Sequence, residues 1–438
     1  MKYSIHFLCS VLLTVISISS PVLATEFFVA TDGKDNFEGT KEKPFATVQR
    51  AQQAVNPGDT VYIRGGKYVL AESQIASIER QWAYVTKLDK SGTKENPIRY
   101  WAFENETPIF DLSQIKPANK RIDAFHIFGS WIHIKGIEVV GVQVTIKGHT
   151  QSICFANDGS HNIYEMLSMH DGQAIGIYSV KGSDNLFLNC DAYNNHDYTS
   201  ENGKGGNVDG FGCHPPKGGT GNIFRGCRAW YNSDDGYDCI NAAESVTFEN
   251  CWAMYSGTNA KGDKLGDGNG FKAGGYGSTP VARLPNPIPR HAVRFCLAVG
   301  NRASGFYSNH HLSGSDWINN TAVRNGNNFN MLCREPDNKT DIDGIGHTLV
   351  NNLSFNSKRD IAKYDAAKCT ATNNWFDLKL DITEKDFQGV DEKELIGPRK
   401  KNGDLPDVKY MHLAKDSPLN GAGAADGKRN YLGAFGNK

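Results

Sequence analysis

The chain has 438 residues and a formal net charge of −1, with 47 lysines and arginines against 48 aspartates and glutamates. This balance gives no reason to expect nucleic acid or an anionic membrane as a partner, because both attract strongly basic surfaces. The length suits one large or two ordinary domains, although a repeat protein escapes that count because each repeat packs against its neighbours.

Residues 1–24 have the features of a secretory signal peptide, with Lys2 in the charged region, an apolar run over 5–18 and a small-residue cleavage site at 22–24. No later stretch approaches the ~18 apolar residues of a membrane span. We therefore expect a secreted or periplasmic protein whose mature part, residues 25–438, makes no contact with a membrane.

Ten cysteines are present, and excluding Cys9 in the signal leaves an odd number for an exported chain. A chain of this size does not need the disulfide framework that small secreted domains use. Four of the cysteines recur at equivalent places in a repeat, namely Cys190, Cys227, Cys251 and Cys296. We expect them to be buried thiols rather than bridges.

An amphipathic helix is predicted shortly after the mature N-terminus, followed by a strand over 60–64. Residues 56–58, Asn-Pro-Gly, end this helix. Its apolar residues fall on one face: Phe45, Val48, Ala51 and Val55. Such a helix suits an N-terminal cap on a solenoid, whose end strands otherwise expose their backbone edges.

From about Trp131 the chain repeats itself as short apolar alternations, each ending in a small residue. The small positions are Ser168, Ala192, Ala229, Ala253, Ala298, Ala322 and Ser354. A polar corner follows three residues later in each repeat: Asp171, Asn195, Asn232, Ser256, Asn301, Asn325 and Ser357. Period-two alternation and a basic repeat near ~24 residues predict an all-β parallel β-helix, whereas leucine-rich repeats and propellers require other patterns.

Two insertions interrupt the repeat at residues 202–221 and 258–290, and both are rich in Gly, Asn, Asp and Pro. Long loops that leave adjacent coils lie side by side, so we expect them to wall a substrate groove. Residues 376–406 lack the repeat and are expected to run along the outside. The segment from 416 to 436 is expected to close the solenoid.

Carboxylates gather in and between these insertions. The sequence reads N-V-D-G-F-G over 207–212, N-S-D-D-G-Y-D-C-I over 232–240, and G-D-G-N-G-F-K-A-G-G over 266–275. The acidic residues are Asp209, Asp234, Asp235 and Asp238, and a single lysine, Lys272, stands in the last motif. Each aspartate alone is an ordinary turn former, but four brought together by successive coils indicate an oxygen-ligand site for Ca²⁺.

These three motifs resemble those of family 9 polysaccharide lyases, which are right-handed parallel β-helix enzymes acting on pectin. The resemblance implies calcium bound by the residues matching Asp209, Asp234, Asp235 and Asp238, with Lys272 as the catalytic base. The family contains both pectate lyases and rhamnogalacturonan lyases, so the choice between polygalacturonate and rhamnogalacturonan I stays open. The expected partner is the acidic backbone of plant cell-wall pectin, and the expected state is a monomer.

The chemistry is consistent with this set of residues. The C5 proton of a uronate is alpha to its carboxylate, so removing it expels the C4 oxygen and cleaves the chain without water. Calcium stabilises the negative charge that develops beside the carboxylate. A nearby cation and partial burial lower the pKa of a lysine, which is ~10.4 when free, so that it can accept a proton.

Arginines suit the substrate carboxylates, because guanidinium offers two parallel donors. Arg302 and Arg334 are the candidates, in that order. A glycoside hydrolase with Asp234 and Asp235 as acid and base is a rival, although consecutive strand residues point to opposite faces. A non-catalytic glycan-binding solenoid is a second rival, but it leaves the acidic cluster and Lys272 unexplained.

Overall fold

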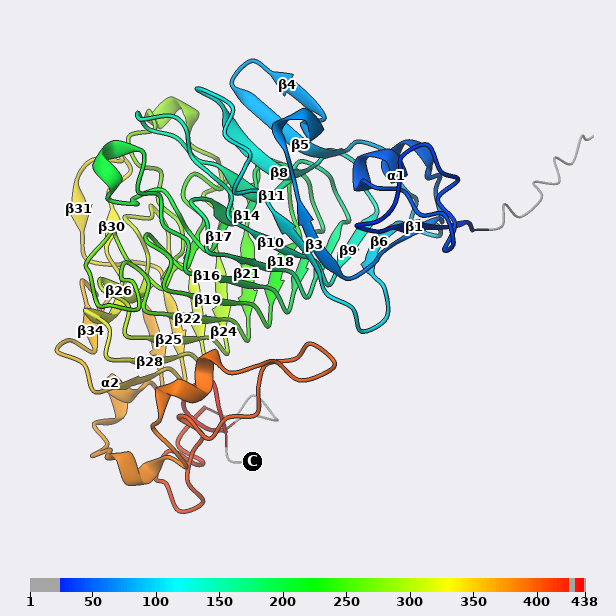
Figure 1. Ribbon diagram of the computed structural model, residues 1–438. Coiled ribbons are helices and arrows are strands. Elements are labelled where there is room, and N and C mark those ends of the chain that lie inside the picture. The colour runs from blue at the N-terminus through cyan, green and yellow to red at the C-terminus, as the bar shows by residue number, and fades with distance from the viewer. Residues whose placement is uncertain (1–23, 425–429, 437–438) are drawn as a thin grey trace, which may run out of the picture.

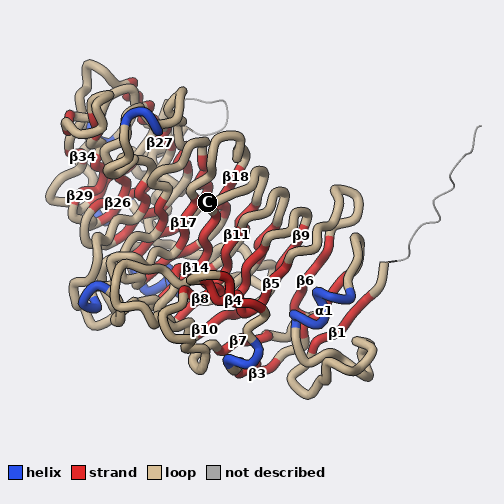
Figure 2. Tube along the Cα trace, turned by 90° about the horizontal axis from the view of Figure 1, so that it is seen from above, coloured by secondary structure: helices blue, strands red, loops and turns tan. Residues whose placement is uncertain are grey.

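The computed structural model describes residues 24–424 and 430–436, and the predicted signal peptide therefore lies almost wholly outside the described residues. Within them, the chain winds through three long sheets, here called sheets A, B and C, whose strands stack coil upon coil (Figures 1 and 2). Pairing is parallel throughout except between β4 and β5 in sheet C and in the separate pair β30 and β31. The predicted parallel β-helix is confirmed.

A complete coil contributes one strand to each sheet, and the coils at the two ends are incomplete. Sheet A contains β1 (Glu26–Val29), β2 (Thr60–Ile63), β6 (Ile98–Ala102), β9 (Ile132–Lys135), β12 (Ile163–Glu165), β15 (Leu186–Leu188), β18 (Asn222–Arg225), β21 (Val246–Glu249), β24 (Ala292–Arg294), β27 (Asp316–Ile318), β32 (Thr348–Val350) and β35 (Thr370–Thr372). Sheet B contains β3 (Gly66–Val69), β7 (Pro108–Asp111), β10 (Glu138–Val140), β13 (Ser168–His170), β16 (Asp191–Tyr193), β19 (Arg228–Trp230), β22 (Trp252–Met254), β25 (Leu297–Val299), β28 (Thr321–Val323) and β33 (Leu353–Phe355). Sheet C contains β4 (Ser77–Glu79), β5 (Trp82–Leu88), β8 (Arg121–Ile127), β11 (Ile153–Asn157), β14 (Ile175–Ser179), β17 (Phe211–Cys213), β20 (Tyr237–Asp238), β23 (Phe271–Lys272), β26 (Ser304–Tyr307), β29 (Asn327–Asn330) and β34 (Ile361–Ala362).

The remaining regular elements are short. The antiparallel pair is β30 (Cys333–Arg334) with β31 (Asp341–Ile342). The α-helices are α1 (Val48–Ala54) and α2 (Trp375–Leu378), and the 3-10 turns are Glu72–Gln74, Glu201–Gly203, Val281–Arg283, Glu384–Asp386 and Glu392–Ile396. Neither α-helix approaches the length and apolar character that a membrane crossing requires.

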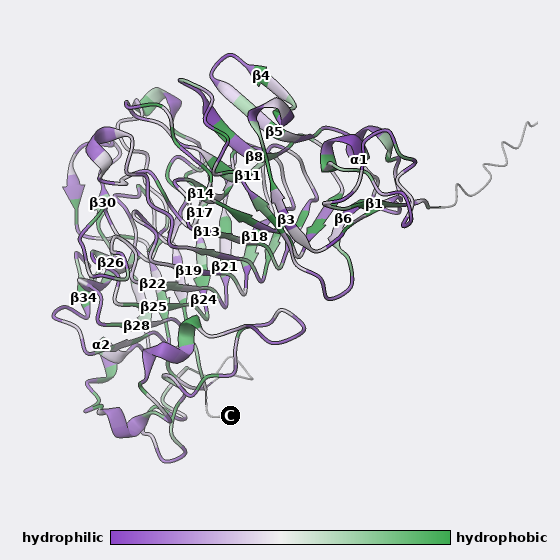
Figure 3. Cartoon of the chain, viewed as in Figure 1, coloured by the Kyte–Doolittle hydropathy of each residue, from purple (hydrophilic) through white to green (hydrophobic). Residues whose placement is uncertain are grey.

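The interior is a set of columns in which like side chains stack from coil to coil. In sheet C one column is aromatic, with ring centroids 5.0 Å apart between Phe211 and Tyr237, 4.6 Å between Tyr237 and Phe271, and 5.1 Å between Phe271 and Phe306. Because side chains alternate between the faces of a strand, an inward aromatic sends both neighbours outward. Hydrophobic colour accordingly follows the strands, while loops are largely hydrophilic (Figure 3).

The small-residue column of sheet B is present, but one predicted member is wrong. Ala192 pairs with Met169, not with Ser168, so the coil is one residue shorter there than the assumed repeat. Further along, Ala229, Ala253 and Ala298 follow in register as expected.

The polar corner is an asparagine ladder in which amide side chains bond one another across coils. Asn195 donates to Asn232 at 3.1 Å, and Asn301 donates to Asn325 at 2.8 Å. The next rung is Asn328 instead of the predicted Ser357, because Asn325 donates to the Asn328 side chain at 2.9 Å. Such ladders satisfy buried backbone groups that a turn otherwise leaves unpaired.

The nine cysteines of the described residues form no disulfide, and all but Cys369 are buried. The prediction of buried thiols is therefore confirmed. Sulfurs of the repeated column face backbone carbonyls, as Cys227 Sγ does toward the Phe187 oxygen at 3.3 Å. Burial raises the pKa of the Cys190, Cys227 and Cys251 thiols, which keeps them protonated and unreactive.

The expected N-terminal helix is α1, which begins after Thr47, whose hydroxyl accepts from the Arg50 amide at 3.0 Å. It buries Val48 and Ala51 beside the first strands. Its role as a cap remains a prediction. At the other end, residues 376–406 pack outside sheet B as expected, for example where Leu395 joins the cluster around Trp230 and Trp252 (Figure 1, orange).

Two histidines in the coils that follow Lys272 are buried. The exposed fractions of His311 and His347 are 0% and 1%. His311 Nδ1 accepts from the Gly275 amide at 3.1 Å, and His347 Nδ1 accepts from the Ser315 amide at 2.9 Å. Burial lowers the pKa of both imidazoles to about 4, so each stays neutral while its ring nitrogen serves as an acceptor.

These histidines predict loss of stability in acid. The unfolded chain binds their protons below a pH of about 6.5, but the native protein binds them only near pH 4, so the free energy of unfolding should fall across that window by up to about 3 kcal/mol for each histidine. Urea unfolding between pH 7 and 4 measures this dependence. In His311→Asn, which keeps an acceptor but cannot titrate, the free energy of unfolding should depend less on pH than in the wild type. Replacing the exposed His149 in the same way should leave the pH dependence unchanged. Equal dependence in His311→Asn and the wild type would contradict the assignment.

Candidate active site

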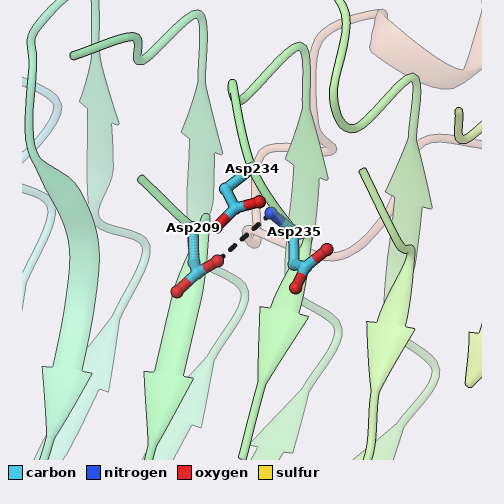
Figure 4. A group of neighbouring side chains, drawn as sticks. All are labelled: Asp209, Asp234 and Asp235. Atoms are coloured by element: carbon cyan, nitrogen blue, oxygen red, sulfur yellow. Dashed lines mark hydrogen bonds between the residues drawn. The ribbon is translucent and has the colours of Figure 1, made fainter. Parts of the chain in front are cut away.

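The acidic residues and Lys272 lie on three neighbouring strands of sheet C. Asp209 precedes β17, and Asp234 and Asp235 precede β20 (Figure 4). Lys272 ends β23. Residues of these strands pair in the order Gly212, Asp238 and Lys272. Because the inward column is aromatic, Asp238 and Lys272 face outward.

A glycine directly precedes each of these strands, at a point where the backbone comes very close to the neighbouring sheet or coil. An added Cβ on Gly210 would lie 2.7 Å from the Ala229 Cβ, and one on Gly236 or Gly270 would lie 2.6 Å from the carbonyl oxygen of the next coil. No side chain fits there, since real Cβ atoms do not approach within 3.0 Å. The glycine of each D-G or N-G pair therefore lets sheet C close on the small residues of sheet B.

The residue before each glycine forms a second ladder. Asp209 Oδ1 accepts from the Asp235 amide at 3.1 Å, and Asp235 Oδ1 accepts from the Asn269 amide at 2.6 Å. Asn269 Oδ1 in turn accepts from the Ser304 amide at 3.2 Å. Each side chain is thus held by the backbone of the following coil, which fixes both carboxylates before any ligand arrives (Figure 4).

Asp234 completes a compact carboxylate group. Its Oδ1 accepts from the Asp267 amide at 2.7 Å, so the second insertion positions it. One oxygen from each of Asp209, Asp234 and Asp235 lies within 4.8 Å of the others. Their exposed fractions are 5%, 6% and 0%.

Both insertions contact the coil that carries this group. Ser233 Oγ donates to the Gly205 carbonyl at 2.7 Å, and the Gly266 amide donates to the Ser233 carbonyl at 2.7 Å. The two insertions therefore meet beside the cluster, where a Cβ added to Gly266 would lie 2.9 Å from Asp234 Oδ1 and 3.0 Å from Gly206 Cα.

Lys272 pairs with the same cluster. Its Nζ lies 3.0 Å from Asp235 Oδ2 and 3.1 Å from Asp238 Oδ2, and its side chain is 12% exposed. Asp238 Oδ1 also accepts from the Ile240 amide at 2.7 Å. Asp238 thus lies against Lys272, outside the compact group of the other three carboxylates.

The pKa values of three of the aspartates and of Lys272 are shifted in the directions expected for a cluster with excess negative charge. Burial first, and then mutual repulsion, raise the pKa of Asp209 and Asp234 well above the ordinary value. Burial also raises the pKa of Asp235, although Lys272 opposes it. For Lys272, burial acts to lower the pKa, but the surrounding carboxylates, led by Asp235 and Asp238, outweigh it and raise the pKa well above normal.

This donor set fits a hard divalent cation. Among the described residues, the ion pairs of the cluster come from Lys272 alone, so four carboxylates share one positive charge. Buried like charges that cannot all ionise are stabilised by a cation bound through oxygen ligands. Asp209, Asp234 and Asp235 would hold it, with Asp238 adjacent.

Within the described residues, the two predicted substrate arginines form no ion pair with the carboxylate group. The exposed Arg302 donates through Nη2 to the carbonyls of Gly266 and Asp267, and so ties down the loop behind Asp234. Arg334 Nε donates to Asp341 at 2.9 Å. A guanidinium has five donors, so these contacts leave others for a ligand.

Sequence reasoning missed several neighbours of the cluster. Asn269 occupies the ladder position equivalent to Asp209 and Asp235, and the shared pattern of acid or amide before Gly-aromatic was its signal. Tyr307 pairs with Lys272 on β26, and Tyr178 pairs with Gly212 on β14. Their approach depends on register between coils of unequal length, which no local pattern reveals.

Comparison with known families agrees with this architecture. A family model described as "Pel9A-like, right handed beta helix region" matches residues 27–352, and one described as "Rhamnogalacturonan lyase-like, C-terminal" matches residues 365–427. "Pectate lyase L" of Dickeya dadantii is 30% identical over 414 residues, covering 93% of this chain and 88% of the relative.

Solved structures agree as well. One titled "Rhamnogalacturonan lyase" superposes with a TM-score of 0.86 at 46% identity, covering 90% of this chain and 97% of the other. "Crystal structure of pectate lyase Pel9A" gives a TM-score of 0.76 at 28% identity, covering 94% and 96%. The β-helix is accordingly right-handed, as the motifs implied. The chain belongs to the Pel9A-like right-handed β-helix family, and it is a polysaccharide lyase.

Proposed function

We propose that the protein cleaves the galacturonate-containing backbone of pectin by β-elimination, with rhamnogalacturonan I as its polymer. The observation that carries the reaction is the contact of Lys272 Nζ with Asp235 and Asp238 beside a buried carboxylate group. The choice of polymer is supported by the 46% identity to the "Rhamnogalacturonan lyase" structure and by the match of residues 365–427.

Asp209, Asp234 and Asp235, with Asp238 beside them, are the proposed calcium ligands. A bound calcium ion would compensate the carboxylates and stabilise the negative charge that develops on the substrate carboxylate. The ladder bonds to the Asp235 and Asn269 amides keep the ligand oxygens in place. These bonds let the site bind without reorganising its backbone.

Lys272 is the proposed base. With the carboxylates compensated, burial is the remaining influence on this lysine and favours its neutral amine. Nζ then takes the C5 proton of the galacturonate, the electrons of that C–H bond form the C4–C5 double bond, and the C4–O bond breaks with its electron pair on the leaving oxygen, which is then protonated by water. Arg302 and Arg334 are the proposed partners for further substrate carboxylates. We also propose that the mature chain from residue 25 acts as one exported catalytic unit and a monomer.

Calcium should stabilise the folded protein as well as activate it. A ligand present at 100 times its dissociation constant adds about 2.7 kcal/mol to the free energy of unfolding. Thermal melts with chelator and with added calcium measure this shift. Asp234→Asn should reduce the shift, and the exposed Asp381→Asn should retain it. Chelation should abolish cleavage, and calcium rather than zinc should restore it. Full activity in protein shown by metal analysis to be calcium-free would refute the role of the ion.

Replacing Lys272 should stop the chemical step without unfolding the calcium-bound protein. General-base catalysis contributes roughly 10²–10⁴-fold, so Lys272→Ala should lose at least that much kcat. Lys272→Arg should be nearly as inactive, because guanidinium does not deprotonate at accessible pH. The assay follows the ultraviolet absorbance of the C4–C5 unsaturated uronate.

The exposed Lys94→Ala is the matched control and should keep wild-type rates. Wild-type turnover by Lys272→Arg would remove Lys272 from the role of base. Saturated products from the wild type would instead indicate hydrolysis.

A further inference from the structure

Outward-facing residues of sheet C form one row across the site. Register pairs place them in the order Tyr307, Lys272, Asp238, Gly212, Tyr178 and Ala156. Neighbouring strands are about 4.8 Å apart, so a polymer that lies across the strands meets these residues in turn. The position of a side chain in the row therefore indicates which sugar of the polymer it faces.

Tyr178 leans toward the carboxylates over Gly212. A Cβ added to Gly212 would lie 2.5 Å from Tyr178 Cδ2 and 2.8 Å from Tyr178 Cε2, so the ring occupies the place of a side chain at residue 212. The ring thus covers the position next to Asp238 in the row, about 4.8 Å from it, and Lys272 Nζ itself lies 3.1 Å from Asp238 Oδ2. It is only partly buried, which leaves ring surface for a ligand.

His214 supports the Tyr178 ring from beside Gly212. The two ring centroids are 4.7 Å apart, and His214 Nδ1 lies 2.5 Å from the Ile240 carbonyl oxygen, to which it donates. Nε2 would lie 2.9 Å from the added Cβ and is buried with no hydrogen-bond partner among the described residues. The imidazole is therefore a neutral support, held on one side by the backbone of the coil that carries Asp238.

The three row positions on this side carry no charge for a substrate carboxylate. Gly212, Tyr178 and Ala156 are uncharged, and the carboxylates of Asp209 and Asp238 lie next to them. Of the cations in the adjacent coils, Lys181 Nζ lies 2.6 Å from Asp158, His126 Nδ1 lies 2.7 Å from Asp123, and Arg121 lies over the Trp82 ring at 5.0 Å. The proposed calcium ion would serve the carboxylate of the cleaved galacturonate, so a second uronate at these row positions would lack a counterion of its own, which is costly.

We propose that Tyr178, laid over Gly212 and supported by His214, is the platform of a subsite for a neutral sugar beside the galacturonate that is cleaved. This assignment rests on the proposed function. An aromatic face packs against the C–H groups of a sugar ring and against the methyl group of a 6-deoxyhexose such as rhamnose. Tyr178 would then make the enzyme select an alternating rhamnose and galacturonate backbone over polygalacturonate.

Steady-state cleavage of the two backbones tests the platform. Oligosaccharides of the alternating backbone and oligogalacturonates of equal length are compared by the unsaturated-uronate assay. The wild type should prefer the alternating backbone. Tyr178→Ala should lower kcat/KM for it at least roughly tenfold, mainly through KM, because a contact made equally in ground and transition states is lost.

Three further variants separate packing from other causes. Tyr178→Phe should stay within about twofold of wild type, since the ring and not the hydroxyl is required. Gly212→Ala should reproduce the loss of preference by displacing the ring, and Tyr178→Lys should shift preference toward oligogalacturonate. Tyr62→Ala, an aromatic change on sheet A, is the control and should alter neither substrate. Calcium-dependent melting of each variant verifies folding.

The outcomes distinguish this inference from the proposed function. A wild type that forms unsaturated product but prefers oligogalacturonate, or a Tyr178→Ala enzyme with an unchanged ratio of kcat/KM values, would overturn the subsite and leave the lyase reaction intact. Absence of unsaturated product from both backbones would overturn the proposed function and the subsite together. Binding of the alternating oligosaccharide to Lys272→Ala protein, weakened by adding Tyr178→Ala, would support the platform without turnover.

Discussion

Parallel pairing between successive coils is the constraint on which the site depends. Backbone bonds between β17, β20 and β23 place Gly212, Asp238 and Lys272 side by side although they come from distant parts of the sequence. The inward aromatic column maintains this register, because a one-residue slip would turn Phe211 or Tyr237 outward and the polar residues inward. The geometry of the proposed site therefore follows from how the core stacks.

Burying several carboxylates together has an energetic cost in this otherwise well-packed structure. Asp235 is wholly buried, and its pKa is raised by the same burial that stabilises the aromatic column beside it. Lys272 relieves part of the repulsion but cannot balance four acids. A local energetic cost of this kind is typical of sites built to bind charge, since the ligand rather than the fold supplies the missing stabilisation.

The repeat could be predicted from the sequence because the same side-chain sizes and polarities recur in each coil. Ala192, Ala229 and Ala253 marked the same column in sequence and in structure. Ser168 was misplaced by one residue, since the period is an average and a coil can lose a residue in a turn without changing its strand. The four carboxylates were predicted because each lies in a local motif. Tyr178 and His214 were not, because their meeting over Gly212 depends on three-dimensional register and on the absence of a side chain.

Because of the glycine column, the position of the site does not depend on the length of the loops. Gly210, Gly236 and Gly270 fix where each strand of sheet C begins by contact with the neighbouring sheet and coil, whatever path the chain takes beforehand. The connections from β16 to β17 and from β22 to β23 are long, whereas that from β19 to β20 is short, yet all three end on the same column. Insertions and deletions in those connections can therefore reshape the loops around the carboxylate group, and with them the polymer branches that are admitted, while the proposed reacting groups keep their places.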